Sequence, residues 1–330
     1  MVTLDPNLAN RRDSGRPPSR AVASKFLASL SHRYVVDRPL GNGGMGAVYL
    51  ARDAKLGRPV AIKVVYSEVA DHIDPERFLG EIRLTAGLQH PHILPVIDSG
   101  CVDGVLYYIT PYLAEGSLHS LLEQDGPLPL ERAIGIALDV LEALEYAHAQ
   151  GVVHCDIKPE NILLSHGHAI LADFGIATTT TAIGRRDRKD VWGSPAYVSP
   201  EQASGERHLD GRSDLYSLGC VLYEMLAGSQ MFTGANTMAV VAKRFNSPPP
   251  QLDTVCRSVP RRVSAAVSRA LSVDPAARFD TARALGLELA NALRDPRLAL
   301  RSGLKDPGLR HKIARWVRGA ALLLLALFAG

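Results

Sequence analysis

Short apolar runs alternate with turn residues in the first third of the chain, and longer apolar repeats follow them. The runs at 34–40, 48–50, 60–65 and 106–113 are rich in β-branched and aromatic residues, which predicts strands. Residues 130–148 instead carry apolar residues at helical spacing, which predicts a long helix. Further helical segments fill the sequence to about residue 293. The pattern therefore places strands first and helices after them.

A glycine-rich turn lies between the first two expected strands. Gly41, Gly43 and Gly46 form a GxGxxG pattern, and Val48 belongs to an apolar strand directly after it. A dinucleotide-binding fold would need a helix at this point, whereas a plain glycine-rich hairpin needs no ligand. A strand after the glycines favours a loop that covers the phosphates of ATP, because residues without a Cβ atom let backbone N–H groups approach phosphate closely.

A single lysine stands in the centre of the β-branched run 60–65. Lys63 either points to solvent from an edge strand or needs a negative partner, because an unpaired charge in a buried strand is costly. A resemblance to protein kinases implies a glutamate on a helix as that partner, and the candidate is Glu81, which lies near the apolar face of a predicted helix. Glu76 competes with it, but a glutamate in the first helical turn is explained by the helix dipole.

The polar stretch 154–161 gathers an acid, a base and an amide between short apolar runs. Asp156 and Asn161 are five positions apart, with Lys158 between them. Alone, such a stretch can be an ordinary loop. Asp173 follows 17 positions after Asp156 and directly after a short apolar strand, and it opens an Asp-Phe-Gly triplet. The order of these residues resembles the catalytic loop of protein kinases, and the resemblance implies a site for phosphoryl transfer that uses metal ions.

Together these motifs resemble the eukaryotic-like Ser/Thr protein kinases of bacteria. GNGGMGAVY, AIK, HCDIKPEN, ADFG, GSPAYVSPE and SDLYSLG occur in the order of that family, over roughly residues 34–290. The resemblance implies an α+β, two-lobed protein kinase fold over 32–293. Its small β-rich N-lobe would cover about 32–112, its larger α-helical C-lobe about 113–293, and ATP would bind between them.

The resemblance also implies a role for each matching residue of the polar stretch. Asp156 would orient the substrate hydroxyl and accept its proton. Lys158 would neutralise charge on the transferred phosphoryl group, and a lysine here is typical of Ser/Thr rather than Tyr kinases. Asn161 and Asp173 would hold Mg²⁺, or Mn²⁺ in its place.

The nucleotide site implied by the resemblance comes from the early strands. Lys63, paired with Glu81, would position the α- and β-phosphates of ATP. Backbone groups near Pro111 and Leu113 would hold the adenine ring. The phosphates would be covered by Leu40, Gly41, Asn42, Gly43, Gly44, Met45, Gly46, Ala47 and Val48.

Three further matches would stabilise the larger lobe. Glu201 and Arg278 would form an ion pair, and Asp214 would brace the polar stretch 154–161, which is the catalytic loop in the resemblance. From the local sequence, Ser213 is a plausible N-cap for the helix that begins near it.

One position departs from the family. Cys155 stands where the family usually has an arginine, which binds phosphate on the activation loop through its bidentate geometry. Phosphorylation is therefore expected to be less coupled to activity in this chain. The candidate phosphorylation sites are four consecutive residues of the polar stretch 176–199, namely Thr178, Thr179, Thr180 and Thr181. If two copies of the chain phosphorylate each other, the second copy is a partner, and the two would form a homodimer.

The expected function is transfer of the γ-phosphoryl group of Mg·ATP to Ser or Thr hydroxyls of protein substrates. A pseudokinase scaffold that binds nucleotide without catalysis is the alternative, and the retained lysine and acids argue against it. A small-molecule kinase is a third hypothesis, and the GSPAYVSPE segment, which resembles a peptide-docking loop, argues against that one. The net charge is only +3, so no global field favours nucleic acid as a partner.

The two ends of the chain lie outside the predicted domain. Residues 1–31 mix Pro, Ser, Arg and Asn without periodicity, which predicts a disordered basic arm. Residues 294–318 form a basic juxtamembrane segment with eight Lys or Arg, and residues 319–330 are uncharged. A helix of these last residues would measure about 18 Å, short of the ~30 Å bilayer core. They are expected to be a partial transmembrane or anchor segment, with a buried core helix as the alternative. The preceding positive charge places the kinase domain in the cytoplasm.

Overall fold

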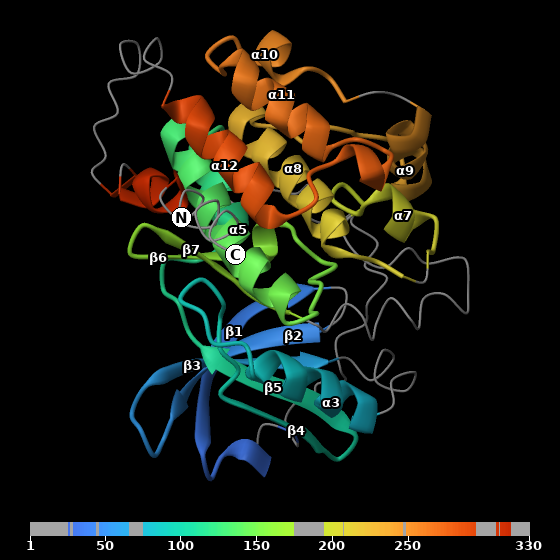
Figure 1. Cartoon of the computed structure of the whole chain (residues 1–330). Coiled ribbons are helices and arrows are strands. Elements are labelled where there is room, and N and C mark those ends of the chain that lie inside the picture. Colours follow the sequence, from blue (N-terminus) through green and yellow to red (C-terminus); the bar gives the residue numbers. More distant parts are fainter. Residues whose placement is uncertain are drawn as a thin grey trace, which may run out of the picture. The chain divides into compact units, whose positions relative to one another are not determined.

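The computed structural model describes residues 26, 29–43, 46–65, 75–174, 195–206, 208–246, 249–294, 308–309 and 311–317. The chain divides into two compact units (Figure 1). The small lobe comprises residues up to 80 together with 96–112, and the large lobe comprises 81–95 and the residues from 113 onward. The division confirms the two-lobed α+β fold. Residues 81–95 group with the large lobe, although the sequence places them in the small one.

The small lobe is built on one antiparallel sheet of five strands, in the order β1-β2-β3-β5-β4. Alternate residues of β3 are buried, and Val60, Ile62 and Val64 form the core together with Tyr107 and Ile109 of β5. This alternation is what a β-branched run on a half-buried sheet produces. The strand bounds are β1 (Tyr34–Gly43), β2 (Gly46–Asp53), β3 (Pro59–Val65), β4 (Asp98–Val102) and β5 (Val105–Pro111).

The basic arm expected over residues 1–31 ends earlier than the sequence predicts. Phe26 and Leu30 are buried and belong to the small-lobe core. The Phe26 ring meets the Tyr107 ring edge to face, with 5.3 Å between centroids. Phe26 and Leu30 are at i and i+4 and pack together against the apolar residues of the sheet. The free energy gained by burying them orders this part of the segment, although its composition is polar.

A long central helix organises the large lobe. The buried face of α5 (Leu130–Ala149) packs against α8 (Gly211–Ala227), α12 (Ala282–Leu293) and the strand β7 (His168–Leu171), as Figure 1 shows. Strand β7 pairs with β6 (Ile162–Ser165) in a two-stranded sheet. The helical period of the sequence therefore predicted the element that carries most of this core.

The helix α3 spans Pro75–Ala86, and the division between the two units falls within it, after Gly80. Shorter elements complete the large lobe. Asp210 caps α8 by accepting a hydrogen bond from the Arg212 N–H at 2.8 Å, so the prediction that Ser213 is the N-cap is wrong. The other elements are α4 (Leu118–Asp125), α7 (Pro200–Ala203), α9 (Thr237–Asn246), α10 (Leu252–Val255), α11 (Arg261–Ala270), and the 3₁₀ turns η2 (Pro159–Asn161) and η3 (Pro275–Ala277).

The expected basic juxtamembrane segment contains a helix that packs on the large lobe. Residues 308–309 and 311–317, here called the tail helix, bury Leu309, Ile313 and Trp316. A Cβ atom on Gly286 would lie about 2.5 Å from the Trp316 ring, which is too close for packing. Helix α12 therefore needs a glycine at this position. Apolar residues at i, i+4 and i+7 give this basic stretch one buried face.

Within the described part of the chain, no helix has both the length and the apolar character needed to cross a bilayer. The expected anchor, residues 319–330, lies outside the described residues.

Candidate active site

The glycine-rich turn is the hairpin between β1 and β2. Gly41 has open space where a side chain would stand, so the backbone there can approach a ligand. Gly46 has a different reason to be glycine, because a Cβ atom would lie 2.0 Å from the Val64 carbonyl oxygen of β3. Gly44 and Met45 lie outside the described residues. Of these glycines, Gly46 is therefore required by the sheet, whereas Gly41 leaves room for a ligand.

Lys63 lies in the middle of the small-lobe sheet rather than at its edge. It is paired with Val48 on β2 and with Tyr108 on β5, and its Nζ lies 5.7 Å from the centroid of the Tyr108 ring. The alternative of an edge-strand lysine is thereby excluded. Glu81 belongs to α3 and to the other unit, so its pairing with Lys63 stays a prediction. Pro111 ends β5, and Leu113 begins the large-lobe segment that follows.

The polar stretch 154–161 holds its three functional side chains within hydrogen-bonding distance. Lys158 Nζ donates to Asp156 Oδ2 at 2.7 Å, and Asn161 Nδ2 donates to the same oxygen at 2.9 Å. Asn161 Nδ2 also donates to the Asp156 carbonyl at 2.8 Å, which fixes the amide and directs its carbonyl oxygen elsewhere. The side chains of Asp156 and Lys158 remain 19% and 18% exposed, so a substrate can reach them.

The charge of Lys158 is maintained by its partner. Burial is the largest single influence and lowers the pKa of this amine, but the charge and hydrogen bond of Asp156, with the charges of Glu160 and Asp173, together outweigh it. The pKa of Lys158 is therefore raised, and the side chain stays cationic at neutral pH. A fixed positive charge next to the Asp156 carboxylate is suited to a reaction that moves negative charge.

His154 connects this loop to the end of β7. Its Nε2 donates to the Ala172 carbonyl at 2.9 Å, and the Asp156 N–H donates to its Nδ1 at 3.2 Å. The Ala172 N–H in turn donates to the Asn161 carbonyl at 2.8 Å. Asp173 follows directly and has a left-handed backbone, with φ of 66°. Asp173 and Asn161 are therefore brought together from separate segments.

Asp214 holds the backbone of the catalytic loop from below. This fully buried carboxylate accepts the N–H groups of His154 and Cys155, each at 2.8 Å, and the Nε2–H of His148 at 2.8 Å. Burial would raise the pKa of Asp214, but the hydrogen bond and the charge of His148 outweigh it, so the pKa is lowered and the group stays ionised. Sequence reasoning missed His148. The structure shows the packing of this ring at Gly211, where a Cβ atom would lie 2.4 Å from it.

Glu201 and Arg278 form the ion pair that the resemblance implies. Both carboxylate oxygens meet guanidinium nitrogens at 2.7 Å, and both residues are buried. Arg278 also donates to the carbonyls of Ser272, Arg212 and Val273, so all five donors are used. Burial raises the pKa of Glu201, but hydrogen bonds from Arg278 and Ser213 lower it further than burial raises it. The stabilisation is complete above about pH 4.5 and is lost as pH falls through this lowered pKa.

Comparison with known proteins assigns the family. The sequence matches the protein kinase domain over residues 34–288. The chain belongs to the protein kinase family. It is 39% identical to the serine/threonine-protein kinase PknB of Mycolicibacterium smegmatis, over 79% of this chain and 43% of that protein. It is 35% identical to PrkC of Bacillus subtilis, also a serine/threonine-protein kinase, over 82% of this chain and 42% of that one.

This chain is 35% identical to a probable serine/threonine-protein kinase of Clostridium perfringens. The match covers 83% of this chain and 40% of that protein. The chain thus spans about two fifths of the length of the curated relatives it matches. These matches confirm the resemblance to bacterial Ser/Thr protein kinases.

Cys155 occupies the position where the kinase family usually has arginine. Its backbone is left-handed, with φ of 64°, which costs a residue with a side chain about 1 kcal/mol. The Asp214 carboxylate holds its N–H, and Gln202 Nε2 donates to its carbonyl at 2.8 Å. The main chain of the loop is therefore fixed through this position, independently of which side chain it carries.

Of the polar stretch 176–199, which contains the candidate phosphorylation sites, the structure describes only the end, from residue 195. Thr178–Thr181 lie outside the described residues. At 195 the segment is held by Arg244, a buried side chain whose Nη2 donates to the Pro195 carbonyl at 2.5 Å. Farther on, Ser199 and Gln202 form a capping box on α7. Arg244 is a site residue that the sequence did not single out.

The predicted metal residues offer suitable donors. Asn161 presents an amide oxygen, because its Nδ2 is engaged by Asp156. Asp173 offers a carboxylate, and the N–H of the preceding Ala172 donates to the Asn161 carbonyl. Hard oxygen donors of this kind suit Mg²⁺, and fit Mn²⁺ as well. The donor set thus fits the ion that the kinase family implies.

Proposed function

We propose that this chain is an active Ser/Thr protein kinase that transfers the γ-phosphoryl group of Mg·ATP to Ser or Thr hydroxyls of protein substrates. One observation carries the proposal: Lys158, Asn161 and the Asp156 carboxylate are joined by direct hydrogen bonds on a loop held by Asp214. A scaffold without catalytic activity would have no need to maintain this arrangement.

The proposed reaction assigns a step to each of these groups. Asp156 accepts a hydrogen bond from the substrate hydroxyl, aligns its oxygen with the γ-phosphorus and takes the proton as the new P–O bond forms. The bond from the γ-phosphorus to the β-γ bridging oxygen breaks, and ADP leaves. Lys158 lies beside the reacting oxygens and offsets the negative charge that spreads over the phosphoryl group.

The nucleotide would be held by the residues that the family resemblance assigns to it. Lys63, with Glu81, would contact the α- and β-phosphates, and backbone groups near Pro111 and Leu113 would hold adenine. Asn161 and Asp173 would hold Mg²⁺, which when bound neutralises phosphate charge. Because binding and orientation supply most of the rate enhancement in phosphoryl transfer, the fixed loop geometry supports this assignment.

Asp156→Asn and Lys63→Met should each lower phosphoryl transfer by at least about a hundred-fold, because one removes the proton acceptor and the other a phosphate contact. The measurement is transfer of ³²P from ATP to a protein substrate by the purified full chain with Mg²⁺. Lys55→Met and Asp125→Asn replace exposed residues of the same types and should retain normal rates. Near-normal transfer by both site variants would refute the assignment, and nucleotide binding without transfer by the unaltered chain would favour the scaffold.

Autophosphorylation at Thr178–Thr181 is part of the proposal, with a second copy of the chain as the partner. Cys155 cannot bind the phosphate, and the arginines on the same stretch would form exposed ion pairs worth about 0–1 kcal/mol. At 1.36 kcal/mol per tenfold in rate, activation is limited to about five-fold.

Replacing all four threonines by alanine should therefore lower the rate by no more than about five-fold. Cys155→Arg should increase the dependence on phosphorylation, because it supplies a fixed cation. Initial rates of phosphatase-treated and autophosphorylated enzyme on one peptide provide the measurement. A hundred-fold difference for the unaltered chain would mean that a buried cation holds the phosphorylated loop.

Membrane attachment through residues 319–330 is also proposed, on the strength of their uncharged Leu and Ala composition after a basic stretch. The tail helix packs on the large lobe as far as Val317, so the attached segment would begin after it. The kinase domain would then be held at the cytoplasmic face of the membrane.

Two truncations separate attachment from folding. A chain ending at Val317 should move from the membrane to the soluble fraction after lysis and keep its activity. A chain ending at Pro307 should melt roughly 10 °C lower, because three buried apolar side chains of the tail helix are lost. Full-length protein in the soluble fraction would refute attachment, and equal melting temperatures for the two truncated chains would refute the structural role of the tail helix.

A further inference from the structure

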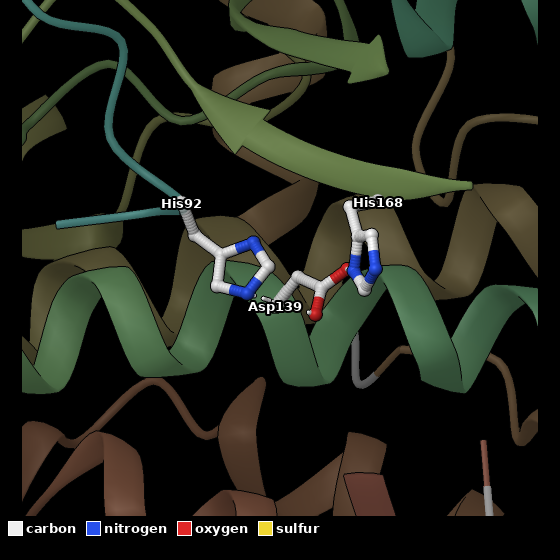
Figure 2. A group of neighbouring side chains, drawn as sticks. All are labelled: His92, Asp139 and His168. Atoms are coloured by element: carbon white, nitrogen blue, oxygen red, sulfur yellow. Dashed lines mark hydrogen bonds and ion pairs between the residues drawn. The ribbon is translucent and has the colours of Figure 1, made fainter. Parts of the chain in front are cut away.

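Two histidines and an aspartate gather on the large lobe, apart from the catalytic loop (Figure 2). His92 comes from the segment before Ile93, Asp139 from α5, and His168 from the start of β7. His92 Nε2 lies 3.3 Å from Asp139 Oδ1, and His168 Nδ1 lies 3.3 Å from Asp139 Oδ2. One ligand atom from each residue falls within 4.8 Å of the others. The proposed kinase reaction uses none of these groups.

The orientation of His92 is set by the backbone. Its Nδ1 lies 2.8 Å from the Ala169 carbonyl, which can only accept, so Nδ1 carries a proton. In the neutral ring the Nε2 lone pair then faces the Asp139 carboxylate, and two electron-rich atoms repel each other unless a positive charge lies near them. Metal-binding histidines show this pattern, with one nitrogen donating to a carbonyl and the other on the metal.

Asp139 needs a cation because it is wholly buried. Its Oδ2 accepts the Ala169 N–H at 3.0 Å and forms a hydrogen bond with His168 Nδ1 at 3.3 Å, whereas its Oδ1 accepts no hydrogen bond of good geometry from any described residue. Lys312 of the tail helix brings its Nζ to 2.6 Å from that oxygen, and the same Nζ donates to the Gly135 carbonyl at 3.1 Å. Lys312 thus neutralises the charge of Oδ1 without forming a hydrogen bond of good geometry. Another cation can therefore replace Lys312 at this oxygen.

We propose that His92, Asp139 and His168 form a binding site for a divalent transition-metal ion, Zn²⁺ by its donor set, and that the ion competes with Lys312 for Asp139. Two imidazoles and one carboxylate leave a fourth position open, as in zinc sites with three protein ligands. Tetrahedral bonds of about 2.0–2.1 Å put donors about 3.3–3.4 Å apart. Each histidine nitrogen lies 3.3 Å from an Asp139 oxygen, which is this spacing, but the two contacts are to different oxygens. One ring must therefore shift for a single Asp139 oxygen to bind the ion together with both nitrogens.

Two features make the site accessible and ordered. The His168 side chain is 55% exposed, so an ion can enter from its side and the ring can move toward the other two ligands. The Ala169 backbone binds both His92 and Asp139, through its carbonyl and its N–H, and thereby fixes these ligands from behind.

The neighbouring charges show what an ion would change. Glu142 Oε2 lies 3.8 Å from His92 Nε2, and Arg315 Nη2 contacts both Glu142 oxygens at 2.7 Å. The tail helix therefore neutralises two carboxylates of α5 with two cations. A metal ion at Asp139 would repel Lys312, so binding of the ion would loosen the tail helix from α5.

Cobalt titration of the full chain tests the site, because tetrahedral Co²⁺ with histidine ligands absorbs visible light. Lys312→Met should bind Co²⁺ at least about ten-fold more tightly than the unaltered chain, since it removes the competing charge. Arg315→Met is the matched control, which removes a cation of the same helix that lies on Glu142, and it should change the affinity far less. His92→Ala should weaken binding by about ten-fold or more.

Trp316 reports the competition. In a Trp192→Phe chain it is the remaining tryptophan, and Zn²⁺ should shift its emission to the red as the tail helix leaves its buried place. The site is overturned if neither the unaltered chain nor Lys312→Met gives a Co²⁺ spectrum. It is also overturned if His92→Ala leaves the Co²⁺ affinity unchanged in either background. Zinc binding without a change in Trp316 emission, or equal affinities for Lys312→Met and Arg315→Met, overturns the competition. If Lys312→Met does not fold, the unaltered chain and His92→Ala decide the site and Trp316 decides the competition.

Discussion

The geometry of the proposed catalytic site depends on the buried carboxylate of Asp214. It accepts two successive N–H groups of the catalytic loop, and one of them belongs to Cys155, whose backbone is left-handed. A loop with such a residue is held in place only by its surroundings, since the local conformation is unfavourable. The lowered pKa of Asp214 means that the acceptor is ionised and therefore strong. Asp156 and Lys158 meet because their backbone has this support.

Asp139 follows the same principle in a second place. Both carboxylates are fully buried, and both accept main-chain N–H groups of segments that lead to Asp156 or Asp173. Asp214 is partnered by His148, a group of the domain itself. Asp139 instead takes its cation from Lys312, on the tail helix. The charge balance of the domain is thus completed by a segment that lies beyond the region matched to the kinase family.

The sequence predicted the features that depend on local pattern or on a spaced motif. The strands, the long helix α5 and the two-lobed fold follow from periodicity and resemblance, and the Glu201–Arg278 contact follows from a motif. Residues whose role depends on distant partners could not be predicted in this way. Nothing near His148 in the chain points to Asp214, and the burial of Phe26 and Trp316 depends on surfaces formed elsewhere. Ser213 failed as a cap because a buried acceptor, Glu201, takes its hydroxyl instead.

The kinetics of Asp214→Asn test most directly whether this carboxylate sets the site. An amide offers one acceptor and places N–H groups against the loop, so kcat should fall at least about a hundred-fold while KM for ATP changes little, and amide exchange at residues 154–156 should accelerate. Asp210→Asn, which keeps a good N-cap on the same helix, should leave both quantities unchanged. A folded Asp214→Asn enzyme with normal kcat and normal loop protection would contradict the account.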